Sequence, residues 1–247
     1  MNVRSLLPVT LAALLVGCQV KEANPTVSAP VKTNAQSASE PPPTPGPTES
    51  ASAASIPAEL KHEGYEYYGL GNDQPVDMEV RTTSDSGVRT GSQITRFKGM
   101  QDGKAVYSIE RTGGLTDLLG QMDVTLEPDG IFVKSSSVAK VGDRDMEMPA
   151  KLSPGTTWEA RTVVEQPGRE LNVLVKFKVV GPENIKTPVG DRSTLRVDST
   201  GEGTLMGKKV RMDSQSWYVK GFGMVKSVLK YTGETGAPST ITIQETK

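Results

Sequence analysis

Apolar side chains occur at every second position through much of residues 60–247, and this two-residue period restricts the fold more than any other feature. In residues 121–133 the apolar side chains share one face of an extended chain, and polar side chains share the other. A helix would scatter such residues around its surface, so the pattern predicts strands. It recurs at 77–83, 92–99, 104–112, 157–165, 171–184, 192–200, 208–220 and 224–232.

Short turns that contain glycine separate these segments, for example at residues 101–103, 128–130 and 206–207. No strand–helix–strand alternation occurs, so we expect an antiparallel sheet. About ten to twelve strands predict an all-β fold, a strongly curved sheet or half-barrel whose polar side faces solvent or encloses water or a ligand. We expect at most one short helix, near residues 115–119.

The first 18 residues, MNVRSLLPVTLAALLVGC, have the layout of a secretory signal, in which Arg4 precedes a short apolar run. The run is shorter than the about 20 residues of a membrane-spanning helix. Its end, LVGC, resembles the lipobox of bacterial lipoproteins. The resemblance implies cleavage of signal peptide 1–17 between Gly17 and Cys18, and lipid on the Cys18 thiol. The alternatives are an ordinary leader with a chance cysteine, or a buried structural thiol.

A lipidated Cys18 would carry two or three acyl chains, palmitate among them, and stable membrane anchoring takes two such signals. We therefore expect a protein held to the cell envelope by its N-terminal lipid. Gln19 follows the cysteine, where inner-membrane lipoproteins of Gram-negative bacteria often have aspartate. By analogy with those lipoproteins, Gln19 favours the outer membrane.

Residues 18–58 are rich in proline, serine, alanine and threonine and contain little to bury. Such a composition predicts a disordered tether, and roughly 40 residues give a typical reach of about 35 Å. Residues 59–247 have the size of a single domain. The whole chain holds 28 basic and 29 acidic residues without a basic patch, so we expect no binding to nucleic acid.

Three motifs between Leu152 and Tyr231 occur in the order known from a family of secreted bacterial proteins and lipoproteins of unassigned function. They are LSPGTTWEA, GPENIKTPVGDRSTLRVDST and SWYVKGFGMVKSVLKY. The resemblance implies a curved antiparallel sheet, loosely similar to the half-barrels of lipoprotein carriers, and it implies no catalytic residues. The chain departs from the family pattern at Val189, where alanine is common, and at Arg192 or Ser193, where an aromatic residue is common.

The last motif contains a predicted hairpin with three aromatic residues. Trp217 and Tyr218 should point to opposite faces of one strand, and Gly221 and Gly223 around Phe222 should allow a sharp turn or bulge. We interpret Trp217, Tyr218 and Phe222 as a packed structural hairpin. The alternative is a ligand platform at the mouth of the sheet.

Residues with reactive side chains do not form a catalytic set. His62 is the only histidine, and a nucleophile–base pair needs a positioned base. Asp143, Asp145 and Glu147 alternate and could bind calcium, but their spacing is not that of a calcium loop, so we interpret them as a solvated face. We predict no catalytic residue, no metal and no cofactor.

These features together predict a lipid-anchored, non-enzymatic protein of the cell envelope. Its β-domain would bind a hydrophobic small molecule or an envelope protein. One alternative is a structural or assembly factor that acts through an exposed sheet edge. The other is a hydrolase whose carboxylates converge only in three dimensions.

Overall fold

The computed structural model describes residues 56–83, 85–142, 144–166, 169–233 and 238–246. The predicted signal peptide, Gly17, Cys18 and most of the tether lie outside these residues. The extents of the signal peptide, the tether and the domain therefore remain predictions.

The described residues form twelve strands in one antiparallel sheet, as the alternation predicts. The strands are β1 (Val76–Thr82), β2 (Asp85–Gln101), β3 (Lys104–Arg111), β4 (Met122–Glu127), β5 (Gly130–Ser136), β6 (Asp145–Pro149), β7 (Thr157–Gln166), β8 (Arg169–Thr187), β9 (Gly190–Leu205), β10 (Lys208–Val219), β11 (Gly223–Gly233) and β12 (Ser239–Glu245).

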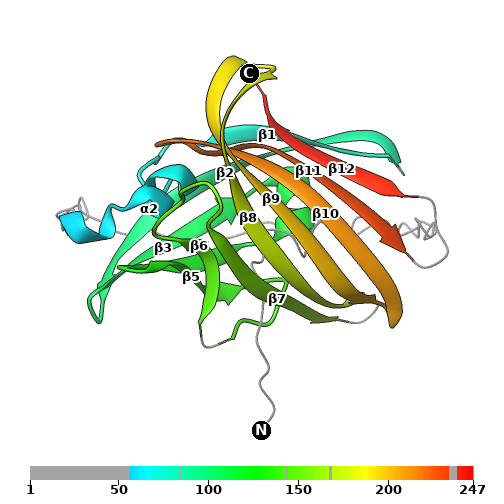
Figure 1. The fold of residues 1–247 in the computed structure, drawn as a ribbon, viewed down its shortest axis with the longest axis horizontal. Coiled ribbons are helices and arrows are strands. Elements are labelled where there is room, and N and C mark those ends of the chain that lie inside the picture. Colours follow the sequence, from blue (N-terminus) through cyan, green and yellow to red (C-terminus); the bar gives the residue numbers. More distant parts are fainter. Residues whose placement is uncertain (1–55, 84, 143, 167–168, 234–237, 247) are drawn as a thin grey trace, which may run out of the picture.

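The strand order is β6-β5-β4-β3-β2-β1-β12-β11-β10-β9-β8-β7. The chain thus builds two meanders, β1–β6 and β7–β12, and the pairing of β1 with β12 joins them. The sheet curls into a nearly closed barrel, so that its two end strands, β6 and β7, come near each other (Figure 1). The predicted all-β class and strand number are confirmed.

A bulge bends the long β8–β9 hairpin. The pairing of β8 with β9 shifts between Val179 and Gly181, and Gly181 has a φ of +137°, which residues with a side chain rarely adopt. Beyond the bulge, the hairpin tip rises toward the C-terminal strand (Figure 1). There Arg192 forms an ion pair with Glu245 of β12.

Two short α-helices accompany the sheet, one more than predicted. The predicted helix is α3 (Gly113–Leu119), which buries Leu115, Leu118 and Leu119. The additional helix is α2 (Glu63–Tyr68), which follows a 3-10 turn, η2 (Ala58–Leu60). Six residues with three tyrosines give little helical periodicity, and the fold specifies α2 through its caps and contacts.

His62 and Gly69 define the two ends of α2. The Nδ1 atom of His62 accepts a hydrogen bond from the Tyr65 backbone N–H (3.1 Å), so His62 is the N-cap. Its Nε2 lies 3.0 Å from the carbonyl oxygen of Glu127 and donates to it. Gly69 ends the helix in the left-handed conformation, with a φ of +78°.

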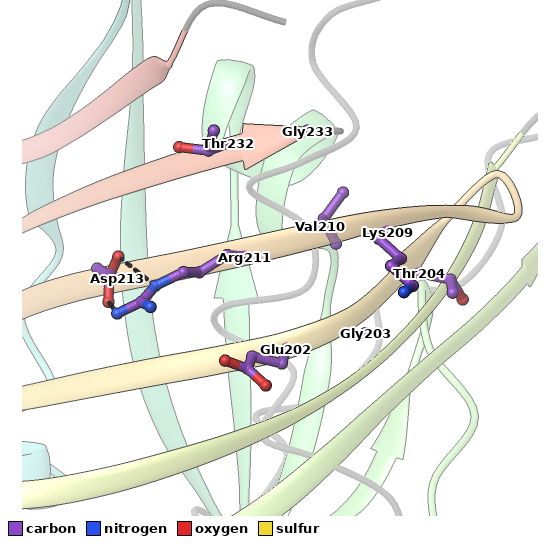
Figure 2. Close-up of a pocket in the computed structure, with 9 residues that line it drawn as sticks. All are labelled: Glu202, Gly203, Thr204, Lys209, Val210, Arg211, Asp213, Thr232 and Gly233. Carbon is purple, nitrogen blue, oxygen red and sulfur yellow. Dashed lines mark hydrogen bonds and ion pairs between the residues drawn. The ribbon is translucent and has the colours of Figure 1, made fainter. Parts of the chain in front are cut away.

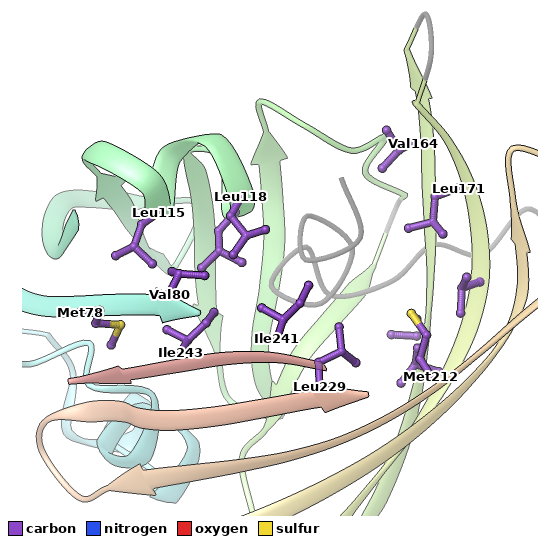
Figure 3. Close-up of a cluster of buried hydrophobic side chains, with 14 of the residues drawn as sticks. Met78, Val80, Leu115, Leu118, Val164, Leu171, Met212, Leu229, Ile241 and Ile243 are labelled. Atoms are coloured by element: carbon purple, nitrogen blue, oxygen red, sulfur yellow. The ribbon is translucent and has the colours of Figure 1, made fainter. Parts of the chain in front are cut away.

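The interior of the barrel contains two apolar clusters. The first cluster lies toward α3 and joins side chains of α3, β1, β7, β8, β10, β11 and β12; Figure 3 shows Leu115, Val80, Leu171 and Met212 among them. The second lies toward α2 and contains Tyr107, Val124, Leu126, Trp158 and Val179. These residues come from the apolar faces that the alternation predicts.

Candidate functional site

The gap between the two ends of the sheet is the first candidate site. We call it the seam: residues 138–142 and β6 on one side, and β7 on the other. One isolated bridge crosses it, in which the Lys140 N–H donates to the Val163 carbonyl oxygen (3.0 Å). Val138 and Ala139 pack against both interior clusters, so the seam borders the interior.

The backbone N–H and C=O groups of successive β7 residues point alternately toward β8 and toward the seam. Because the Val163 carbonyl accepts a bond from Lys140, the polar backbone groups of Val163 point to the seam. In an antiparallel strand this direction repeats at every second residue, so those of Glu159 and Arg161 point the same way. The seam is therefore a sheet edge with a single isolated bridge among the described residues.

The inner face of β7 carries Trp158, Ala160, Thr162 and Val164, all buried. Trp158 stacks on Phe177 of β8, with ring centroids 4.9 Å apart and planes 10° from parallel. Ala160 and Thr162 lie opposite Val175 and Val173. This row is apolar apart from two hydrogen-bonding atoms.

Those two atoms have no hydrogen-bond partner among the described residues. They are the Trp158 indole Nε1 and the Thr162 hydroxyl Oγ1, on side chains of residues that are 9% and 1% exposed. Buried polar groups in proteins nearly always have a partner, and a missing bond costs about 1–3 kcal/mol. Two such atoms on one strand therefore suggest a group from another molecule.

A buried polar cluster lies nearer the helices. Arg111 donates from Nε to Gln93 (2.8 Å) and from Nη1 to the carbonyl oxygens of Leu119 and Gly120 (3.3 and 2.9 Å). It thereby satisfies carbonyls at the C-terminus of α3. The Tyr68 hydroxyl of α2 donates to Glu147 of β6 (3.3 Å), which ties α2 to the seam.

Burial controls ionisation in this cluster. Burial, and then the charge of Glu147, raise the pKa of Tyr68 well above its ordinary value, against the opposing charge of Arg111. Burial and Glu147 also raise the pKa of Tyr218. Both phenols therefore stay neutral at physiological pH and act as hydrogen-bonding groups, not as bases.

The predicted aromatic hairpin places its residues on two faces. The pairing of β10 with β11 shifts between Trp217 and Tyr218. Tyr218 packs against the second interior cluster. Trp217 donates from Nε1 to Glu183 (3.1 Å) and lies under Arg196 and Lys226, with their charged groups 5.9 and 5.4 Å from its ring centroid.

Phe222 occupies the turn between β10 and β11, between glycines with φ values of +75° (Gly221) and +105° (Gly223). The Arg192 guanidinium lies 5.3 Å from its ring centroid. The expected turn is therefore present. The role of Trp217, Tyr218 and Phe222 as a structural or ligand-binding hairpin remains a prediction.

The interpretation of the acidic row as a solvated face is wrong for the two residues described. Asp145 and Glu147 are 4% and 7% exposed, and Met148 of the same strand is buried in the second cluster, so β6 is covered on both faces. Asp145 Oδ2 accepts a bond from the Gly142 N–H (2.7 Å), and Glu147 accepts one from Tyr68. Asp143 lies outside the described residues.

A second candidate site is a hollow of about 900 Å³ on the outer face of β9, β10 and β11 (Figure 2). Its polar lining includes Glu202, Lys209, Arg211 and Asp213, and Arg211 pairs with Asp213 (3.3 Å). The side chains of Glu202, Lys209 and Arg211 are exposed and that of Asp213 is half-buried, whereas the lining also includes Val210, a buried member of the first interior cluster.

In the part of the chain that the structure describes, no three metal-ligating side chains gather in one place. Within the same ranges, neither helix has the length and apolar character of a membrane span.

No protein-family model and no curated protein matches the chain. Among solved structures, it is similar to a protein from Bacteroides fragilis described as exported, with a YmcC-like fold (12% identity, 74% of this chain, 99% of that one, TM-score 0.48). It is also similar to a protein from Parabacteroides distasonis described as a lipoprotein (8%, 74% and 99%, 0.47). A third is the hypothetical lipoprotein YmcC from Escherichia coli (8%, 71% and 90%, 0.30).

The sequence reasoning missed the seam and Thr162 as parts of a site. A usable signal was present, since Trp158, Ala160, Thr162 and Val164 alternate with Glu159 and Arg161. A hydroxyl within an otherwise apolar row marks a position that needs a partner. The alternation does not show which two strands form the ends of the sheet.

Proposed function

We propose that this chain is a lipid-anchored, non-enzymatic protein of the cell envelope whose barrel binds an apolar ligand in its interior. The lipobox and the tether support the anchor, and Gln19 supports the outer membrane. The interior supports the ligand, because apolar walls with a few polar groups are typical of small-molecule sites.

One observation carries the proposal: the Trp158 Nε1 and Thr162 Oγ1 atoms are buried beside the seam and lack partners among the described residues. The seam is the access route that the topology favours, because the ladder of hydrogen bonds is interrupted there. Opening it breaks one described cross-seam backbone bond, whereas opening another strand pair breaks a whole ladder.

The test is native mass spectrometry of the domain, released from the full-length anchored chain by a protease site placed in the tether. No detergent is then needed, and the domain has folded in the envelope. We expect the released domain to carry a bound apolar molecule. Repeated recovery at the bare mass, with an empty solvent extract, would contradict the proposal.

A second candidate function is assembly through the β7 edge, since Glu159 and Arg161 direct backbone groups to the seam. A photo-crosslinker at Glu159 in the intact envelope tests it. A control crosslinker at the exposed Gln215 of β10, a strand paired on both sides, reports chance encounters. One partner protein captured from 159 and not from 215 supports assembly, and equal capture from both opposes it.

A further inference from the structure

We infer that the hollow over β9, β10 and β11 binds an ethanolamine phosphate group, which carries a phosphate and a primary ammonium. The hollow has a volume of about 900 Å³, within the range of small-molecule sites. Lys209 and Thr204 would hold the phosphate, and Glu202 would hold the ammonium. This site goes beyond the apolar ligand proposed for the interior and does not depend on it.

The strand register places these three side chains together. Lys209 of β10 lies directly opposite Thr204 of β9. The next pair on the same face joins Arg211 to Glu202. Thr204 and Glu202 are two residues apart on one strand, so about 7 Å of backbone separates them. Their side chains and that of Lys209 are exposed and lie along the hollow (Figure 2).

Only part of the charged lining is already paired. Arg211 donates from Nε and Nη2 to Asp213, at 3.3 Å each. The bond to Asp213 and, less strongly, the charge of Glu202 raise the pKa of Arg211. The side chains of Lys209, Thr204 and Glu202 make no hydrogen bond or ion pair with the other described residues. The hollow therefore offers one ammonium, one hydroxyl and one carboxylate to a ligand.

These three groups define the chemistry of the ligand. Lys209 and Thr204 both donate hydrogen bonds, which the oxygens of a phosphate accept. The Glu202 carboxylate only accepts, so its partner must donate, and a primary ammonium has three N–H groups. The lining has two cations, Lys209 and Arg211, against two anions, Glu202 and Asp213. A ligand whose own two charges cancel complements this balance.

The spacing of the two subsites selects the length of the ligand. The phosphate subsite at Thr204 and the ammonium subsite at Glu202 are about 7 Å apart along β9. In ethanolamine phosphate, two carbons and an ester oxygen separate the charged groups. In an α-amino acid a single carbon separates them, so that shorter zwitterion does not reach both subsites.

The binding test uses three soluble phosphodiesters: glycerophosphoethanolamine, glycerophosphocholine and glycerophosphoglycerol. They share the phosphate, but the second group is a primary ammonium, a cation without N–H groups, or a neutral diol. NMR titration of the domain released from the full-length chain follows the backbone amides of residues 202–211. We expect the ethanolamine ester to bind about fivefold tighter than the other two, as one exposed ion pair of upper-range strength gives.

Two variants test the subsites separately. Glu202→Gln should reduce the preference for the ethanolamine ester to less than about twofold, and Lys209→Gln should weaken all three esters at least about threefold. The matched control is Lys208→Gln, because Lys208 is also exposed but does not line the hollow. This control should change neither property. All three side chains are exposed, so each variant should keep the wild-type melting temperature.

Three results would overturn the inference: no amide shifts at residues 202–211, equal affinity of the wild type for the three esters, or equal effects of Lys208→Gln and Lys209→Gln. None of them bears on the interior ligand, which the mass of the released domain tests. Flotation of the released domain with phosphatidylcholine vesicles, with or without phosphatidylethanolamine, assigns the source of the bound group. Flotation only with phosphatidylethanolamine identifies a membrane headgroup, and binding of the soluble ester without flotation identifies a free one.

Discussion

Arg192 and Glu245 form a two-point ion pair that fastens the β8–β9 hairpin tip to the last strand. The Nε–Oε1 and Nη2–Oε2 distances are 2.8 and 2.9 Å, and Thr187 also donates to Oε1 (2.7 Å). The Glu245 side chain is 2% exposed and that of Arg192 is 28% exposed. The pair therefore fixes how far the bent hairpin leans over this end of the barrel.

Removal of Arg192 should destabilise the domain, because it leaves a buried carboxylate without its counter-ion. We expect Arg192→Ala to lower the free energy of unfolding by about 2–3 kcal/mol, less than for a pair with two fully buried partners. Urea denaturation measures it. The control is Arg211→Ala, whose pair with Asp213 is exposed and should contribute little to stability. Equal losses in the two variants would contradict this role.

Glycine at position 69 should be required for space as well as for backbone conformation. Gly69 and Gly103 both have a φ of +78°, but a Cβ at 69 would lie 2.5 Å from the Phe222 carbonyl oxygen, and a Cβ at 103 would meet nothing within 4 Å. Gly103→Ala should cost about 1 kcal/mol from the left-handed backbone alone. Gly69→Ala should lower the free energy of unfolding clearly more than Gly103→Ala does, as measured by thermal unfolding. Equal losses in the two variants would count against the close contact between Gly69 and Phe222.

Alkaline pH should destabilise the fold through Tyr68 and Tyr218. Their pKa values are raised in the folded protein, so both stay neutral when the same phenols ionise in the unfolded chain near pH 10. Stability is thus complete below about pH 10 and declines as the pH rises further. Absorbance at 295 nm should show these phenols ionising together with unfolding, and Tyr218→Phe should reduce that step. Ionisation of all tyrosines before unfolding would refute the buried cluster.

Loss of the lipid on Cys18 should change where in the cell the protein is found. Cys18→Ala should prevent lipidation, so the exported chain should take up no labelled fatty acid and lose its lipid-dependent attachment to the membrane. Fractionation with radiolabelled palmitate measures both effects. If the wild type takes up no label and the variant stays attached to the same membrane fraction, the lipoprotein reading is wrong.

The sequence predicts most of the strands because each element shows its own period of two, as in residues 171–179, whose alternate side chains are buried or packed against the core. It does not predict α2, whose six residues depend on the His62 cap and on contacts with distant turns. It also does not predict the seam, because closure depends on long-range pairing of β1 with β12. The sequence also does not predict the burial of Asp145 and Glu147, because it depends on contacts with the Gly142 backbone and with Tyr68 of α2, while Met148 of the same strand packs into the second cluster.

The measurement that tests the central claim most directly is the rate of ligand exchange through a lockable seam. Lys140 and Val163 are bridge partners, so Lys140→Cys with Val163→Cys should form a disulfide across the seam. After release by cutting the tether, the domain lacks Cys18 and holds only these two thiols. We predict that oxidation slows the exchange of bound N-phenyl-1-naphthylamine at least about tenfold, and that reduction restores the wild-type rate. Equal exchange rates in the oxidised and reduced forms would contradict ligand binding through the seam.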